Sequence, residues 1–261
     1  MKWGCCGDVE RIASIAASGY DYIESPVRAL EVANPKGSAD NLVEQVSKTG
    51  LSVEAFNVFI PAPLRIVGPD VDENALNHHI RTTVDRSNDL GTEIIVLGSG
   101  GSRQIPDEWS ASTARHQFLA FCELAADAVS SAGITIAIEP LAESVCNFIL
   151  TVAEGRELAK ASGRDEISFL ADLYHMHMNN DPVEGLKDIA GEISHVHLPV
   201  PNIPGQIDHE PEFDHAGYLR ALKHGGYEGR ISIEDNGKRF SDFDREAGLV
   251  LQYLKEIWAS V

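Results

Sequence analysis

Short apolar runs with β-strand character alternate with helical patterns from one end of this chain to the other. The predicted strands are Lys2–Cys6, Tyr20–Glu24, Ser52–Val58, Glu93–Gly98, Ile134–Glu139, Ile167–Asp172, Ile193–Leu198 and Arg230–Glu234. The predicted helices lie near residues 8–18, 38–49, 72–91, 109–132, 151–162, 183–189, 214–225 and 241–258. Parallel strands need a long crossover between them, and a helix after every strand supplies it. This order therefore predicts an α/β fold with a parallel sheet.

Eight strand–helix units in 261 residues fit a closed barrel in both number and length. A doubly wound open sheet is the competing arrangement, but it seldom needs eight units. No linker rich in Pro, Gly and Ser divides the chain, and the hydrophobic content of 43% is ample for a buried core. The sequence therefore predicts a (β/α)8 barrel, or TIM barrel, as a single domain over residues 1–261.

Capping signals support several helix boundaries. Thr151 is followed three residues later by Glu154, which is the spacing of a capping box. Ser241 precedes two acidic residues and suits another helix N-terminus. Gly91 and Gly133 each stand where a helix should end before a strand.

The formal net charge of −19, from 40 acidic and 21 basic residues, bears on the binding partner. Nucleic acids and anionic membranes both require a basic face, so the charge disfavours them. No run approaches the roughly 18 apolar residues of a membrane span, and residues 1–30 lack the features of a signal peptide. Neither a disulfide framework nor a CxxC site is indicated, and reduced cytoplasmic thiols are the simplest interpretation of Cys5, Cys6, Cys122 and Cys146.

The last four predicted strands each end near a residue that can bind metal: Glu139, Asp172, His197 and Glu234. Active sites of β/α barrels form at the carboxyl-terminal ends of the strands. Side chains alternate between the two faces of a strand, and these four residues lie on the smaller or more polar face. Because the apolar face should pack on the helices, all four side chains should point toward the barrel axis.

Three converging carboxylates would repel one another, and each is costly to bury unless it is paired or metal-bound. The competing interpretation is that these residues cap helices or form surface ion pairs, but it would have to hold at all four strand ends. We therefore expect one divalent metal ion. Three carboxylates and an imidazole favour Mn²⁺, with Mg²⁺, Co²⁺, Fe²⁺ and Zn²⁺ also possible.

Four segments around these strand ends carry a family resemblance: Ile138–Leu141 (IEPL), Asp172–Met176 (DLYHM), His195–His197 (HVH) and Ile231–Glu234 (ISIE). Weaker agreement runs through residues 19–24 and 98–103. In these motifs the chain resembles the sugar isomerase and epimerase families with xylose-isomerase-like barrels. Ketose 3-epimerases and hydroxypyruvate-isomerase-like proteins are the most similar of them. The resemblance covers essentially the whole chain.

By this resemblance, Glu139, Asp172, His197 and Glu234 bind one divalent metal ion, and the two glutamates are also the catalytic acid/base pair. The metal would stabilise an enediolate while one glutamate removes a proton and the other returns it. Return to the opposite face gives epimerisation, and return to the adjacent carbon gives isomerisation. The resemblance also implies that His175 binds the substrate, a small carbohydrate.

Other polar residues near the strand ends allow two interpretations. Glu24 is either a substrate contact or a structural acid, whereas His195 is expected to be a hydrogen-bonded core histidine and His177 a loop histidine. The stretch Gly98–Gly101 is expected to be a tight turn, and the alternative is an anion site assisted by Arg103. Four aromatic residues could line the pocket but are expected in the core: Trp3, Phe56, Phe59 and Trp109.

The chain departs from the epimerases at two positions that bind substrate in that family. Residues 199–204 contain no arginine after the metal histidine, and Val145 stands where a glutamate is usual, although Glu143 is close by. These differences leave the predicted metal site intact and point to a substrate other than an ordinary ketohexose.

Three further functions remain as alternatives to a sugar isomerase or epimerase. A metal-dependent dehydratase of a keto-polyol would use the same enolisation and then lose a β-hydroxyl. A phosphodiesterase like the barrel-shaped abasic-site endonucleases would need additional metal-binding histidines and a basic groove, which the charge opposes. A binding protein without catalytic activity is the third. By analogy with the relatives, the chain could form a homodimer or homotetramer.

Overall fold

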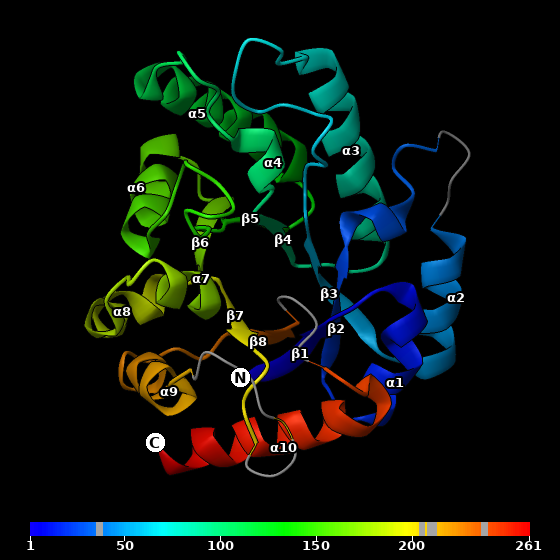
Figure 1. Ribbon diagram of the computed structural model, residues 1–261. Helices are drawn as coiled ribbons and strands as arrows, with labels where there is room; N and C mark the ends of the chain where they lie inside the picture. The colour runs from blue at the N-terminus through cyan, green and yellow to red at the C-terminus, as the bar shows by residue number, and fades with distance from the viewer. Residues whose placement is uncertain (35–38, 204–206, 208–212, 236–239) are drawn as a thin grey trace.

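The computed structural model describes residues 1–34, 39–203, 207, 213–235 and 240–261 (Figure 1). Parallel strands pair in sequence order, and the last strand pairs with the first, so the sheet closes into a barrel. The strands are β1 (Lys2–Cys6), β2 (Tyr22–Pro26), β3 (Ser52–Asn57), β4 (Ile94–Leu97), β5 (Thr135–Ile138), β6 (Ile167–Asp172), β7 (His195–Pro199) and β8 (Arg230–Glu234). The predicted (β/α)8 barrel is confirmed.

Helices surround this barrel as an outer layer (Figure 1). They are α1 (Ile12–Ala17), α2 (Asp40–Thr49), α3 (Glu73–Asp89), α4 (Gly100–Arg103), α5 (Ala111–Val129), α6 (Val152–Ser162), α7 (Leu173–Met178), α8 (Leu186–Ile189), α9 (His215–His224) and α10 (Phe243–Ser260). Short 3-10 turns are η1 (Val9–Arg11), η2 (Val27–Leu30), η3 (Val183–Gly185) and η4 (Ala190–Glu192).

Several boundaries differ from the predicted ones. The second strand begins and ends two residues later in the chain than expected, and the seventh begins at His195 rather than Ile193. The short helices α4 and α7 were not predicted. Asp172 both ends β6 and caps α7 by accepting a hydrogen bond from the backbone N–H of His175, so strand and helix meet without a loop.

The expected helix caps are present, with one shift. Thr151 and Glu154 form a reciprocal capping box at the start of α6. Gly91 and Gly133 adopt positive φ angles of 72° and 69° after α3 and α5, a conformation that glycine reaches without a Cβ clash. At α10 the cap is Asp242 rather than the neighbouring Ser241.

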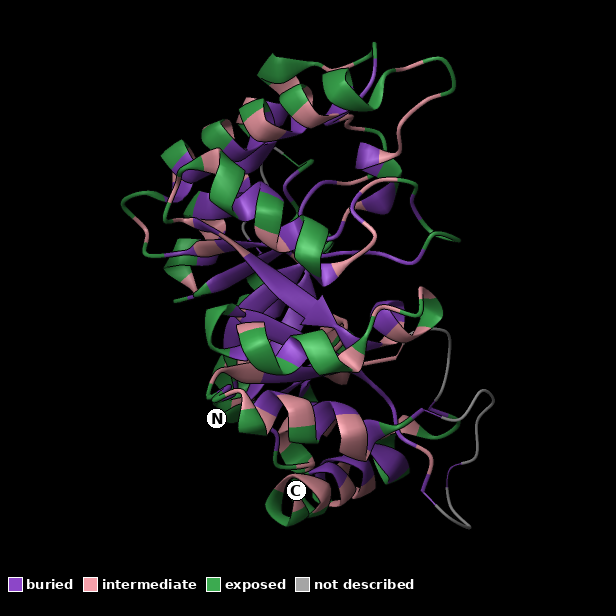
Figure 2. Ribbon diagram, turned by 90° about the vertical axis from the view of Figure 1, so that its left-hand side faces the viewer, coloured by how far each residue is buried: buried purple, intermediate pink, exposed green. Residues whose placement is uncertain are grey.

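Two apolar layers form the core, as strand parity predicts. A small cluster fills the barrel interior, and a much larger one lies between the strands and the helices. The interior cluster consists of Tyr22, Ala55, Ile94, Val96, Ala137 and Leu170. Figure 2 shows the strands as buried and the outward faces of the helices as exposed. Gly4 gives the ring of Tyr22 its space, because a Cβ there would lie 2.2 Å from that ring.

Charged residues close the barrel at its amino-terminal end. Glu54 lies 2.6 Å from Nζ of Lys2 and 2.5 Å from Nε of Arg230, and Arg230 also lies 2.5 Å from Glu93. These pairs join strands β1, β3 and β8 to the residue that precedes β4. Arg230 and Glu234 stand at opposite ends of β8, so this ion network is at the other end of the barrel from Glu234.

Two further sequence expectations concern membrane-spanning segments and cysteines. Within the described part of the chain, none of the helices combines the length and apolarity that a membrane crossing requires. All four cysteines are free thiols, and three of them are buried.

Candidate metal centre and active site

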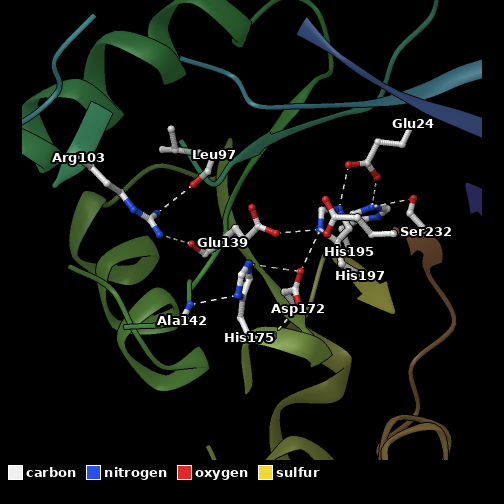
Figure 3. A network of polar contacts seen from close by, with 11 residues as sticks. Glu24, Leu97, Arg103, Glu139, Ala142, Asp172, His175, His195, His197 and Ser232 are labelled. Atoms are coloured by element: carbon white, nitrogen blue, oxygen red, sulfur yellow. Dashed lines mark hydrogen bonds and ion pairs between the residues drawn. The ribbon is translucent and has the colours of Figure 1, made fainter. Parts of the chain in front are cut away.

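The four strand-end residues gather around one nitrogen atom. Nδ1 of His197 lies 2.8 Å from a carboxylate oxygen of Glu139 and 3.5 Å from one of Asp172 (Figure 3). It also lies 3.4 Å from a carboxylate oxygen of Glu234. Potential ligand atoms of all four residues lie within 4.8 Å of one another. The structure therefore brings together the predicted set at the carboxyl-terminal ends of β5 to β8.

This geometry fits a single cation closely. Ligands on opposite sides of an ion with bonds of about 2.1 Å are about 4.2 Å apart. Small side-chain movements would therefore bring all four ligand atoms within bonding distance of one ion. Asp172 is 1% exposed, and its Oδ2 has no hydrogen-bond partner among the described residues. A buried carboxylate oxygen without a donor is costly, and a bound cation would remove that cost.

The ionisable side chains of the cluster are buried and close together, and this shifts their pKa values. Burial, together with Asp172 and Glu139, raises the pKa of Glu234 to about 7. Burial also opposes ionisation of Asp172, but His175 and His197 outweigh it and lower the pKa of Asp172. Burial alone would lower the pKa of His197, but the carboxylates around it, with Glu24 foremost, raise that pKa well above its usual value.

His175 lies beside the cluster on α7. Its Nδ1 accepts a hydrogen bond of 3.1 Å from the backbone N–H of Ala142, so a neutral ring carries its proton on Nε2. Nε2 is 4.0 Å from Oδ2 of Asp172 and faces the cluster (Figure 3). The structure thus places a potential hydrogen-bond donor beside the predicted metal ligands.

The glycine-rich stretch after β4 serves Glu139. A Cβ on Gly98 would lie only 2.0 Å from Oε2 of Glu139, so the carboxylate needs the space that glycine leaves. Arg103 is fully buried and donates to the backbone carbonyls of Leu97 and Glu139 at 3.1 and 2.6 Å (Figure 3). These bonds join the ends of β4 and β5. Because they use the guanidinium of Arg103, they argue against the anion-binding role that was considered from the sequence.

Glu24 lies beneath the cluster. Its two carboxylate oxygens contact Nε2 of His197 at 2.8 Å and Nε2 of His195 at 2.7 Å, and all three side chains are buried (Figure 3). Glu24 is therefore a structural acid, and His195 is the hydrogen-bonded core histidine that was expected. Sequence reasoning did not connect the two, because 171 residues separate them.

A cavity of about 330 Å³ opens beside Glu234 at the barrel mouth. We call it the mouth cavity; it is lined by Cys6, Gly7, Asp8, Arg11, Pro26, Arg28, Asn57, Glu234 and Asp235. Both arginines in its wall are paired with aspartates, Arg28 with Asp8, and Arg11 with Asp235 at 3.7 Å. The wall is thus polar, and its arginine charges are balanced. The sequence did not predict these residues as part of the site.

The residues expected in the core are found there. Trp3, Phe56 and Phe59 are buried, and Trp109 is partly buried with its indole N–H donating to Gln117 at 3.0 Å. His177 was expected on a loop, but it lies on α7, which begins directly after β6. Its ring is 5.5 Å from that of Phe213, so it belongs to side-chain packing outside the cluster.

A comparison with protein families matches residues 12–257 to the family described as xylose isomerase-like TIM barrels. The chain belongs to this family. The match spans the barrel from α1 to α10 and therefore includes all four residues of the cluster.

Two curated relatives of this xylose isomerase-like barrel are named for isomerisation or epimerisation. A putative hydroxypyruvate isomerase of Drosophila melanogaster is 24% identical over 86% of this chain and 87% of its own length. An L-ribulose 3-epimerase of Mesorhizobium japonicum is 28% identical over 90% of this chain and 78% of its own length. Among solved structures, the IOLI protein with a bound zinc atom is 19% identical, with a TM-score of 0.74 over 100% of this chain and 99% of that one.

The two departures from the epimerase pattern also have a structural setting. Val145 is 53% exposed on the loop after β5, so no carboxylate is supplied from that position. Ile203, in the segment where the epimerases carry an arginine, is buried. Residue 204 lies outside the described residues.

Proposed function

We propose that this xylose isomerase-like barrel is a divalent-metal-dependent isomerase or epimerase of a small sugar or sugar derivative, acting by proton transfer through an enediolate. The observation that carries the proposal is the convergence of Glu139, Asp172 and Glu234 on Nδ1 of His197. The names of the two curated relatives support the same reaction class.

Glu139, Asp172, His197 and Glu234 would hold the metal ion. Their donor set and the unpartnered oxygen of Asp172 suit a divalent cation, and the zinc of a structural relative is consistent with that. Mn²⁺ remains the favoured ion because three carboxylates and one imidazole suit it. When bound, such an ion polarises a carbonyl and its neighbouring hydroxyl, which makes the adjoining C–H acidic.

The protein's own groups would move the proton. Glu139 follows β5 and Glu234 ends β8, with two strands between them, so the carboxylates approach the site from different directions. Both groups are carboxylates, which can act as a general base and, once protonated, as a general acid. One glutamate would remove the substrate proton and the other would return it, while His175 donates a hydrogen bond to a substrate oxygen.

The mouth cavity supports a small polar substrate of low charge. Its volume of about 330 Å³ is at the low end of ligand pockets, and its arginines are already paired. An uncharged polyhydroxy compound matches this wall better than a phosphorylated sugar. The missing arginine and glutamate of the epimerases argue that the substrate differs from an ordinary ketohexose.

The acid/base assignment is tested with Glu139→Gln and Glu234→Gln. Each variant should lose at least about 10²-fold in turnover, because loss of a general acid or base has that effect. Glu157→Gln, an exposed position on α6, is the matched control and should retain activity. Circular dichroism should show the same fold in all three. Activity close to wild type in either active-site variant would contradict the assignment.

The reaction class is tested by a substrate screen in deuterated solvent with mass detection. Incorporation of solvent deuterium without loss of water identifies an isomerase or epimerase. Loss of water identifies the dehydratase alternative and rejects the proposal.

The metal requirement is tested in the same assay, since a chelator should abolish turnover and added Mn²⁺ should restore it.

A further inference from the structure

Glu24 holds two histidines with one carboxylate. Oε1 lies 2.8 Å from Nε2 of His197, and Oε2 lies 2.7 Å from Nε2 of His195. Glu24 and His195 are 0% exposed, and His197 is 1% exposed, so water does not compete for these bonds. A buried carboxylate costs free energy unless its oxygens are satisfied, and here each oxygen has one imidazole donor.

These contacts determine which nitrogen of His197 keeps its proton when a metal ion binds the ring. An ionised carboxylate only accepts hydrogen bonds, so both Nε2 atoms must donate to Glu24. Nδ1 of His197 is also within hydrogen-bond distance of Glu139, at 2.8 Å, so in the metal-free protein it too can donate. When that proton leaves, the ring keeps its proton on Nε2 and presents a lone pair on Nδ1, the atom that the other three carboxylates surround. His195 agrees with this assignment, because its Nδ1 has no hydrogen-bond partner among the described residues.

The carboxylate is itself held from inside the barrel. His195 is 3.2 Å from Oγ of Ser232, and that hydroxyl is 2.9 Å from the hydroxyl of Tyr22. Tyr22 and Glu24 point inward from the same strand, and the register of β2 against β3 shifts between Ile23 and Glu24. A continuous polar chain therefore runs from the barrel interior to His197 and restricts how Glu24 can move. Figure 3 shows its part from Ser232 through His195 and Glu24 to His197.

We infer that Glu24 is the residue that positions His197 for metal binding, by fixing the ring orientation and keeping its proton on Nε2. The inference rests on the metal centre of the proposed function. Partners that hold a ligating histidine in this way typically contribute 10- to 100-fold to metal affinity. Glu24 touches neither the mouth cavity's substrate space nor the other three ligands in any described contact, so it acts through His197.

The test measures the dissociation constant of Mn²⁺ for metal-free protein, from the electron paramagnetic resonance signal of the unbound ion. Glu24→Gln preserves size but replaces one acceptor by an amide donor, so the two histidines cannot both donate to it. Its dissociation constant should rise about 10- to 100-fold. Glu54→Gln is the matched control, because Glu54 is also a buried strand carboxylate held by hydrogen bonds, here from Lys2, Ser52 and Arg230. That variant should lower thermal stability and leave the dissociation constant unchanged.

The variant Cys6→Ser tests whether Glu24 is instead a direct metal ligand. Potential ligand atoms of Cys6, Glu24 and His197 also lie within 4.8 Å of one another, so these residues form a second candidate group. Cys6→Ser should leave the dissociation constant unchanged if Glu24 acts through His197. A comparable loss in Cys6→Ser and Glu24→Gln would assign the ion to that second group and overturn the inference.

Nitrogen NMR of the zinc-loaded wild type gives a readout that does not depend on a variant folding. His197 should show metal on Nδ1 and a proton on Nε2, and a proton on Nδ1 would overturn the inference. Wild-type affinity in a folded Glu24→Gln protein would also overturn it and leave the metal centre standing. A wild-type chain that binds no divalent ion would overturn the metal centre of the proposed function together with the inference.

Discussion

Gly98 shows how a single residue can decide the shape of the site. Its missing side chain leaves the space that Oε2 of Glu139 occupies, 2.0 Å from where a Cβ would stand. The neighbouring Arg103 holds the backbone of Glu139 through a bond of 2.6 Å to its carbonyl oxygen. Backbone and side chain of Glu139 are thus positioned by two residues of the segment that follows β4.

Gly98→Ala should therefore displace the Glu139 carboxylate without unfolding the barrel. A misplacement of about 1 Å can cost about 10²-fold in rate, and we expect a fall in kcat/KM of that order. Gly185→Ala is the control, because a Cβ there meets no atom within 4 Å. Steady-state kinetics and metal titration of both variants check this. Full activity in Gly98→Ala would show that Glu139 can function from another position.

His197 makes metal binding depend on pH. The carboxylates around it, with Glu24 foremost, raise its pKa well above the usual value and so favour the imidazolium form in the metal-free protein. The ion needs the deprotonated Nδ1, so binding must release a proton. Apparent affinity should rise with pH until the pH passes the pKa of His197. Calorimetry in two buffers of different ionisation enthalpy measures the released protons, and a heat independent of buffer would contradict this account.

A buried carboxylate in the first turn of helix α10 gives this element its own pH dependence. Glu246 is 1% exposed and accepts bonds from the backbone N–H and hydroxyl of Ser241 at 2.9 and 2.6 Å. It also accepts from Arg245 at 2.6 Å. Burial opposes ionisation, but these donors, Ser241 first, lower the pKa of Glu246 to about 2.

Glu246→Gln should lower the free energy of unfolding at pH 7 by about 1.5–3 kcal/mol, the range for hydrogen bonds to a charged group. Because the folded pKa is depressed, the wild-type advantage is complete above the unfolded pKa of about 4.3 and declines as pH falls toward 2. Urea unfolding at pH 7 and pH 3.5 measures both differences. Glu256→Gln, exposed on the same helix, is the control and should show little change at either pH.

The elements themselves were predictable where local signals are strong. The capping box at Thr151 and the glycine ends of α3 and α5 formed as expected, because these signals act within a few residues. Helix α7 was not predicted, because its N-terminus is the same Asp172 that ends β6. A residue that serves as strand end, cap and candidate ligand gives no separate local signal for the helix.

Metal binding should stabilise the whole molecule, because the ion would join strands β5, β6, β7 and β8 at one point. A ligand at 100 times its dissociation constant adds about 2.7 kcal/mol to the free energy of unfolding. A chelator should therefore lower the melting temperature in calorimetry, and Mn²⁺ should restore it. Asp172→Asn, which loses a predicted ligand, should respond much less. Equal melting temperatures of the wild type with and without chelator would argue against the site.

The chain by itself determined the barrel and the direction of its strand-end residues. Strand–helix alternation and the two-residue period of each strand are local properties, and they were enough to turn Glu139, Asp172, His197 and Glu234 inward. Only the tertiary structure decided which side chains support them. Barrel closure brings β2 across the interior to β7, which pairs Glu24 with His195 and His197. Such contacts join residues more than 170 positions apart, and no local pattern encodes them because they depend on how the closed barrel packs.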